Sequence, residues 1–172
     1  VEKKIEGLWL WFGISELNQD GCPDIYVCND YLSNDLIWIN NKDDTFTNKI
    51  SSAIKNQSNS AMGNDVADIN NDGLQDLLTL DMMPEDNYHR KMMHVPATYD
   101  RREAETNLGY QQQSMRNMLQ VNQGFKENGD PYFSEAGYYA NIYATDWSWS
   151  ALMADFDNDG FQDIFVSGYD TR

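Results

Sequence analysis

Three short segments of the 172-residue chain carry oxygen-bearing side chains at a spacing that suits calcium. In segments 16–24, 68–76 and 155–163, an acidic or amide residue stands at loop positions 1, 3, 5 and 9, and glycine stands at position 6. Calcium takes about six to eight oxygen ligands on a flexible frame, glycine permits the sharp bend, and the carbonyl of position 7 can face the ion. We therefore predict up to three Ca²⁺ sites. Their ligands are Glu16, Asn18, Asp20, Cys22 and Asp24; Asp68, Asn70, Asp72, Leu74 and Asp76; and Asp155, Asp157, Asp159, Phe161 and Asp163, where Cys22, Leu74 and Phe161 contribute the backbone carbonyl.

The residues that flank these loops favour β-strands over the two helices of an EF-hand. An EF-hand loop needs a bidentate glutamate at position 12, and that position holds Val27, Thr79 or Val166 here. Each loop runs instead into an apolar stretch typical of a strand buried on both faces, and alternating residues precede it. The predicted unit is strand, calcium loop, strand; the alternative is an Asx-rich hairpin turn without metal. Glu16, where the other loops have Asp, is expected to weaken or reshape the first site.

The negative charge of the chain is concentrated in these loops. The formal net charge is −16, from 28 acidic and 12 basic residues, and ten of the acids lie in the three loops. Such an acidic chain is a poor partner for nucleic acid, while an apolar fraction of 41% with 13% aromatic residues argues against disorder. No apolar run approaches the ~20 residues of a membrane-spanning helix. Because the chain opens with Val1, we expect a mature product or a fragment.

The distances between the loops indicate a structural repeat with one insertion. The first two loops begin 52 residues apart, and the last two begin 87 residues apart. Phe46 and Phe133 each stand 22 residues before the loop that follows them, so most of the additional residues fall in segment 83–116. This segment carries five basic and five acidic residues, is therefore neutral overall, and is predicted to be partly helical.

The length of the repeat predicts the architecture. A unit of roughly 50 residues with about four short strands is typical of one blade of a β-propeller. We therefore predict an all-β fold in which residues 1–172 form about three blades of a seven-bladed propeller, with 83–116 inserted in the second repeat. A partial propeller leaves an open sheet edge, so the remaining blades are expected from missing chain or from a partner.

Several longer motifs resemble a known family. The stretches NNKDDTF, SAMGNDVADINNDGLQDLLTLDMMPEDN and YATDWSWSALMADFDNDG are similar to FG-GAP/VCBS repeat proteins, and more closely to bacterial relatives of cartilage acidic protein that carry an ASPIC/UnbV module. The resemblance implies an integrin-α-like β-propeller with structural calcium in its blade loops, on secreted, surface-anchored or periplasmic proteins. Two residues depart from the family pattern: Glu16 replaces an Asp, and Asp44 stands where the NNxDGTF turn has Gly. The ASPIC/UnbV module itself is not in this chain.

Function is predicted from these loops and from the resemblance. We expect a non-enzymatic, calcium-stabilised module at the cell surface or outside the cell that binds a protein or a glycan. Two alternatives stay open: a subunit of an outer-membrane nutrient-uptake assembly, and a non-catalytic part of a polysaccharide-processing enzyme. The sequence offers no nucleophile–base arrangement, phosphate-binding loop or Cys/His metal cluster.

The insertion contains both histidines, which lie close in sequence to Met82, Met83, Met92 and Met93. His89 and His94 would point about 140° apart on a helix, which is poor geometry for a shared transition metal, so surface or packing roles are favoured. The methionine-rich insertion either caps the propeller face or forms a flap that binds a partner.

Two other groups of residues give separate predictions. Cys22 and Cys28 are too far apart along an extended strand for a disulfide and are expected to be free thiols. Trp149 shares the strand register of other apolar residues and is expected in the core, whereas Tyr138 and Tyr139 are candidates for glycan contact.

Overall fold

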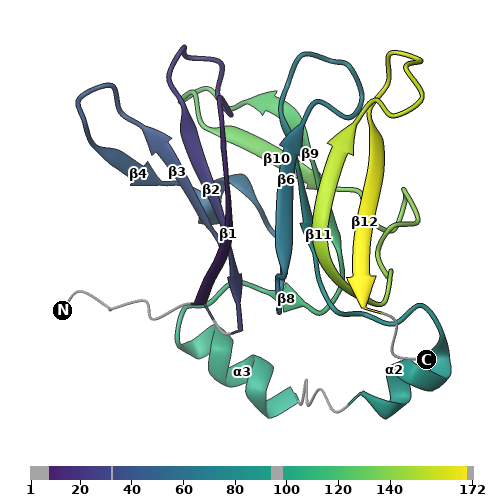
Figure 1. Ribbon diagram of the computed structural model, residues 1–172. Coiled ribbons are helices and arrows are strands. Elements are labelled where there is room, and N and C mark those ends of the chain that lie inside the picture. Colours follow the sequence, from purple (N-terminus) through teal and green to yellow (C-terminus); the bar gives the residue numbers. More distant parts are fainter. Residues whose placement is uncertain (1–7, 32, 94–98, 170–172) are drawn as a thin grey trace.

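The first sheet is an antiparallel meander at the N-terminal end of the chain. The computed structural model describes residues 8–31, 33–93 and 99–169. Four strands pair in chain order, namely β1 (Leu8–Ser15), β2 (Asp24–Asp30), β3 (Leu36–Asn40) and β4 (Phe46–Asn48) (Figure 1). Asp44, in the turn between β3 and β4, has a φ of 64°, so it adopts the left-handed conformation for which the family motif uses glycine. Aspartate tolerates this conformation better than most residues do.

The second sheet repeats this meander around the insertion. Its strands are β6 (Gly63–Ala67), β7 (Asp76–Leu80), β9 (Met118–Phe125) and β10 (Pro131–Glu135), which pair in that order. The segment between β7 and β9 contains α2 (Asn87–Met92), α3 (Tyr99–Asn107) and β8 (Gln113–Ser114). β8 pairs in parallel with β5 (Gln57–Ser58), which follows the short helix α1 (Ile50–Ala53). The insertion therefore interrupts the sequence of the second meander without changing its strand order.

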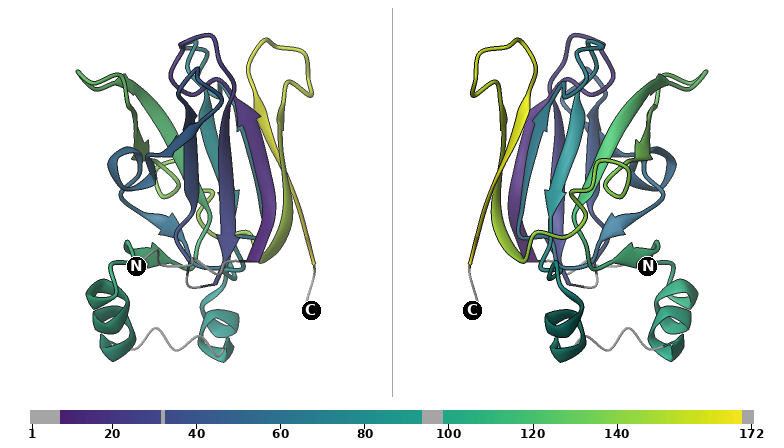
Figure 2. Two further views of the ribbon diagram at one scale, coloured as in Figure 1. Left: turned by 90° about the vertical axis from the view of Figure 1, so that its left-hand side faces the viewer. Right: turned by 90° about the vertical axis from the view of Figure 1, so that its right-hand side faces the viewer.

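A hairpin of β11 (Trp147–Ala154) and β12 (Asp163–Tyr169) forms the third sheet. β6 lies between β1 and β11, so the first strands of the three sheets run side by side (Figure 1). The loops β1–β2, β6–β7 and β11–β12 are at one end of the molecule, and α2 and α3 are at the opposite end (Figures 1 and 2). The prediction of an all-β fold is confirmed in part, because the fold is mostly β with helices. The sheets formed by residues 8–31, 33–93 and 99–169 remain separate and do not close, so the predicted propeller is not confirmed by them.

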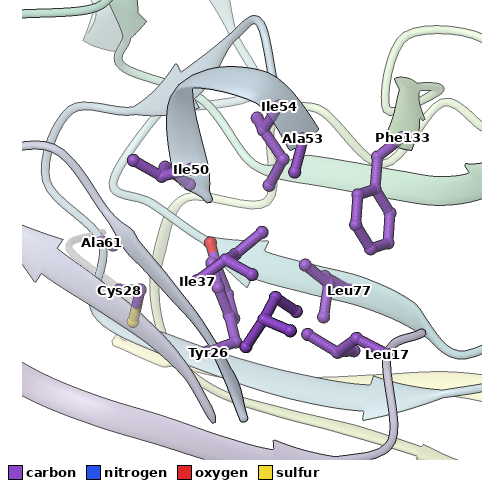
Figure 3. Close-up of a cluster of buried hydrophobic side chains, with 11 residues drawn as sticks. Leu17, Tyr26, Cys28, Ile37, Ile50, Ala53, Ile54, Ala61, Leu77 and Phe133 are labelled. Atoms are coloured by element: carbon purple, nitrogen blue, oxygen red, sulfur yellow. The ribbon is translucent and has the colours of Figure 1, made fainter. Parts of the chain in front are cut away.

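The main core fills the space between the first two sheets. Tyr26 and Ile37 from the first sheet meet Leu77 and Phe133 from the second, and α1 closes the cluster (Figure 3). Leu78, the next residue of β7, belongs to a second cluster against the third sheet. Successive side chains of a strand face opposite sides, so β7 is buried on both faces, as its unbroken apolar run predicts.

The same prediction is wrong for β12, and so is the buried position expected for Trp149. Phe165 in β12 is 56% exposed and Trp149 in β11 is 49% exposed. Their apolar character matches that of β7, but no described sheet packs against the outer face of this hairpin. Burial of a strand depends on its neighbours, which the local sequence does not specify.

A buried polar group joins the first two sheets beside the main core. The hydroxyl of Tyr26 in β2 lies 2.8 Å from Oδ2 of Asp35 and 2.8 Å from Oγ1 of Thr79 in β7. Oδ1 of Asp35 accepts the backbone N–H of Asn29 at 3.0 Å. Burial raises the pKa of Asp35 to about 7, although the hydrogen bonds from Asn29 and Tyr26 favour the charged form.

Replacement of Asp35 by asparagine should flatten the pH dependence of stability. The folded protein holds the Asp35 proton more tightly than the unfolded chain does, so this group destabilises the fold as the pH rises from about 4 to about 7. Asp35→Asn cannot titrate, yet its oxygen can still accept the Asn29 N–H. The free energy of unfolding, measured in urea across this range, should therefore fall less steeply with pH than in the parent. The exposed Glu127→Gln serves as control, and identical slopes for Asp35→Asn and the parent would contradict the assignment.

Candidate metal centres

Each predicted calcium loop joins two antiparallel strands at the same end of the molecule (Figure 1). The residue that ends each loop at position 9 pairs with the last residue of the preceding strand. The three pairs are Ser15 with Asp24, Ala67 with Asp76, and Ala154 with Asp163. The predicted unit of strand, loop and strand is confirmed, and the identical pairing places the three loops in equivalent positions.

The third loop brings three carboxylates together. Oxygen atoms of Asp155, Asp157 and Asp159 all lie within 4.8 Å of one another. Backbone N–H groups fix this arrangement, because Gly160 donates to Asp155 at 2.9 Å and Phe161 donates to Asp159 at 2.8 Å. Hard oxygen ligands gathered on one turn suit a divalent cation such as calcium.

The second loop has the same hydrogen bonds, with an amide replacing one carboxylate. Gly73 donates its N–H to Asp68 at 2.7 Å, and Leu74 donates to Asp72 at 2.8 Å, as at the matching positions of the third loop. Asn70 occupies position 3, where its Oδ1 accepts the N–H of Asp72 at 3.0 Å. This loop therefore offers three carboxylates where the third offers four.

The first loop differs in the reach of its acid and in a nearby lysine. Glu16 accepts the N–H of Gly21, so its longer side chain reaches the group that Asp contacts in the other loops. Nζ of Lys42 lies 2.8 Å from the carbonyl oxygen of Asp20 and 3.6 Å from its Oδ2. Although burial works against it, hydrogen bonds from Asn18 and Cys22 and the charge of Lys42 lower the pKa of Asp20. A protein cation at this loop would compete with a metal ion.

The backbone bends at the same two positions in all three loops. Glycine at position 6 has a positive φ, as predicted: 86° at Gly21, 85° at Gly73 and 91° at Gly160. The residue at position 4 also has a positive φ: 53° at Gln19, 59° at Asn71 and 61° at Asn158. Two left-handed residues in each loop turn the chain tightly enough to aim its oxygens inward.

The aspartate at position 9 binds its loop to the sheet. In the first loop, Asp24 accepts the N–H of Leu17 at 2.9 Å and the N–H of Asn40, in β3, at 2.9 Å. The same bonds in the second loop join Asp76 to Ile69 at 3.0 Å and to Asn122, in β9, at 2.8 Å. Burial raises the pKa of Asp24 and of Asp76, and nearby loop carboxylates raise each further, against the effect of these bonds.

Adjacent loops are hydrogen-bonded to each other through position 4. The side-chain amide of Gln19 donates to the carbonyl oxygen of Gly73 in the second loop at 2.7 Å. Asn71 donates in the same way to Gly160 in the third loop at 2.8 Å. The sequence signal for this contact is the amide residue shared by position 4 of all three loops, which the calcium-ligand pattern ignores.

The other predicted candidates lie away from the loops. Cys22 and Cys28 are free thiols, as predicted, and burial raises the pKa of Cys28 to about 12, so this thiol is inert near neutral pH. Nδ1 of His89 contacts Asp86, which caps α2, while His94 lies outside the described residues. Tyr139 is 96% exposed, and Tyr138 packs against Tyr143 with ring centroids 4.6 Å apart.

Comparison with known families supports the repeat in the first part of the chain. Residues 17–79 match the FG-GAP-like repeat. The matched residues begin in the first loop, include β2, β3, β4, β6 and the second loop, and end in β7. No curated protein matches the chain. In the described part of the chain, none of the helices combines the length and the apolar character needed to span a membrane.

Loss of the position 9 carboxylate should harm the second loop far more than the third. Asp76→Ala leaves the buried N–H of Asn122 without its acceptor, which costs about 1–3 kcal/mol, and it also removes the acceptor of the half-buried N–H of Ile69. Asp163 is exposed and accepts one N–H, from Phe156, at 3.1 Å, so Asp163→Ala should cost much less. Urea unfolding in EDTA measures both losses without metal.

Asp76→Asn provides a milder variant of the same site. It keeps one acceptor oxygen and should fall between the parent and Asp76→Ala in stability. Equal losses for Asp76→Ala and Asp163→Ala would show that the two hydrogen bonds do not set the stability of this loop.

Proposed function

We propose that the protein is a calcium-stabilised, non-enzymatic β-propeller module that binds a protein or glycan at the cell surface or outside the cell. The observation that carries this proposal is the third loop, where three carboxylates converge on a turn repeated twice more in the chain. The FG-GAP-like repeat is of a surface or adhesion type, which supports the location and the binding role. The closer kinship to bacterial ASPIC/UnbV proteins is part of the same proposal.

The arrangement of the sheets supports the propeller. Two four-stranded meanders and a hairpin present their first strands, β1, β6 and β11, side by side. Phe12 on β1 of the first sheet is 66% exposed, and Phe165 on β12 of the third sheet is 56% exposed. Further blades of the same kind would cover both apolar surfaces, as β7 and its neighbours are covered between adjacent sheets.

Calcium would act here as a structural ion. The loop carboxylates repel one another at one end of the molecule, and divalent cations between them would remove that repulsion. Backbone N–H groups already hold these carboxylates in place, which favours the fixed ligand shell of a structural ion over the changing shell of a catalytic ion. Calcium outside cells, at about millimolar concentration, would fill even weak sites.

Calcium should raise the melting temperature of the protein, and magnesium should do so much less. At free calcium about one hundred times Kd, one site adds about 2.7 kcal/mol of stability, or roughly 5–10 °C for a domain of this size. Calorimetric titration should give up to three calcium ions per chain. We expect the first loop, with Lys42 beside Asp20, to fill last.

Ligand variants test the assignment loop by loop. Asp159→Asn and Asp72→Asn should each remove one calcium ion from the stoichiometry, because each replaces the position 5 carboxylate that all three loops share. Glu127→Gln, with the same change of charge at an exposed turn, should bind as the parent does. A melting temperature that is the same in EDTA and in calcium would overturn the proposed role of the ion.

A further inference from the structure

A cavity of about 320 Å³ lies at the end of the molecule opposite the calcium loops. Arg90 from α2, Arg102 from α3 and Arg116 from the residues before β9 line it. No acidic side chain is among its described lining residues, although the chain carries 28 acidic residues. Arginine fits carboxylate, phosphate and sulfate groups because its planar N–H donors match their oxygens.

Arg116 forms a fixed wall of this cavity. Its Nη2 lies 2.6 Å from Oε2 of Glu135, and both side chains are nearly buried. Its guanidinium stacks on the ring of Tyr138 at 4.4 Å from the centroid. The charge of Arg116 is therefore neutralised within the protein, and its role is to hold the wall in place.

Among the described residues, Arg90 and Arg102 form no ion pair with an acidic side chain. Arg90 donates through Nε to the carbonyl of Pro84 at 2.6 Å and lies over the ring of Tyr143 at 5.4 Å. Its Nη2 is buried and has no acceptor among the described residues. No hydrogen bond or ion pair joins the Arg102 guanidinium to another described residue. A buried guanidinium N–H without an acceptor is costly, so an added oxyanion would be stabilising here.

The remaining wall is apolar and adaptable. Met83, Met93 and Met115 line the cavity together with Pro84 and Tyr138. Methionine adjusts to irregular shapes and packs favourably against aromatic groups. The volume is that of a small-molecule site, and it is too small for a folded partner.

We propose that this cavity binds a small organic oxyanion: a carboxylate, sulfate or phosphate group on a compact apolar body. Arg90 and Arg102 bind the oxyanion, and the methionines enclose the body. The site is independent of the calcium loops, because it is built by the insertion and the opposite end of the second sheet. A short acidic peptide is the competing occupant.

Methyl NMR of ¹³C-methionine reports this binding directly. With calcium saturating, titration of benzoate, phenyl sulfate and phenyl phosphate should shift the methyls of Met83, Met93 and Met115, with Kd of about 0.1–10 mM. The buried methyls of Met62 and Met153 should not shift, and they also confirm that each variant is folded. The three anions differ in their oxyanion, so their relative affinities identify which group the arginines prefer.

Charge variants test the two arginines. Arg90→Gln and Arg102→Gln should each weaken binding by about ten- to a hundredfold, because a charge-assisted hydrogen bond is lost. Lys91→Gln makes the same change of charge on α2 but does not line the cavity, so binding should stay within about twofold. If Arg90→Gln loses the core methyl signals, Arg102→Gln, on the exposed side of the cavity, carries the test.

Three results would overturn the proposal. Equal shifts with the neutral analogue benzamide would mean an apolar pocket without anion recognition. Equal weakening by Lys91→Gln and Arg90→Gln would mean only general electrostatic attraction. Binding of a hexaglutamate peptide with no shift from the small anions would assign the surface to a protein partner.

Discussion

The fold and the first two loops both depend on the hydrogen bonds of the buried aspartate at loop position 9. In Asp24 and Asp76, one carboxylate oxygen accepts an N–H from the loop and the other accepts an N–H from the next strand of the sheet. The residue that closes the loop therefore also fixes the register of the adjoining strand. The two hydrogen bonds keep a carboxylate in a place where burial raises its pKa. Loop conformation and strand pairing therefore depend on the same side chain.

Position 4 extends this coupling from one sheet to the next. Gln19 and Asn71 both have a positive φ. The side-chain amide of each donates to the carbonyl of the position 6 glycine in the next loop. An ion bound in the second or third loop would therefore also order the glycine carbonyl that accepts the side-chain amide of the preceding loop. The hydrogen-bonded loops form a row along one end of the molecule. The strands that lead into them, β1, β6 and β11, pack side by side, so loop conformation and strand packing are coupled.

The sequence predicts the loops well because their geometry is local. Glycine at position 6 and oxygens two residues apart are properties of one tight turn, and the hairpins follow from the apolar runs beside it. The exposure of Phe165 and Trp149 could not be predicted, because it depends on whether another sheet packs on their strands. The group of Tyr26, Asp35 and Thr79 joins residues of two sheets, and no spacing along the chain marks it.

The arginine cavity shows why a neutral segment can still be an electrostatic site. Segment 83–116 has equal numbers of acidic and basic residues, but Arg116 is neutralised by Glu135 from outside it. Arg90 and Arg102 line the cavity, and none of the described lining residues is acidic. The net charge of −16 does not prevent an anion from binding there. β7 alone separates the two ends by about 17 Å, whereas charges are screened over about 8 Å at physiological ionic strength. An anion at the cavity therefore experiences mainly the local guanidinium groups, and the acidic loops at the far end have little influence on its affinity.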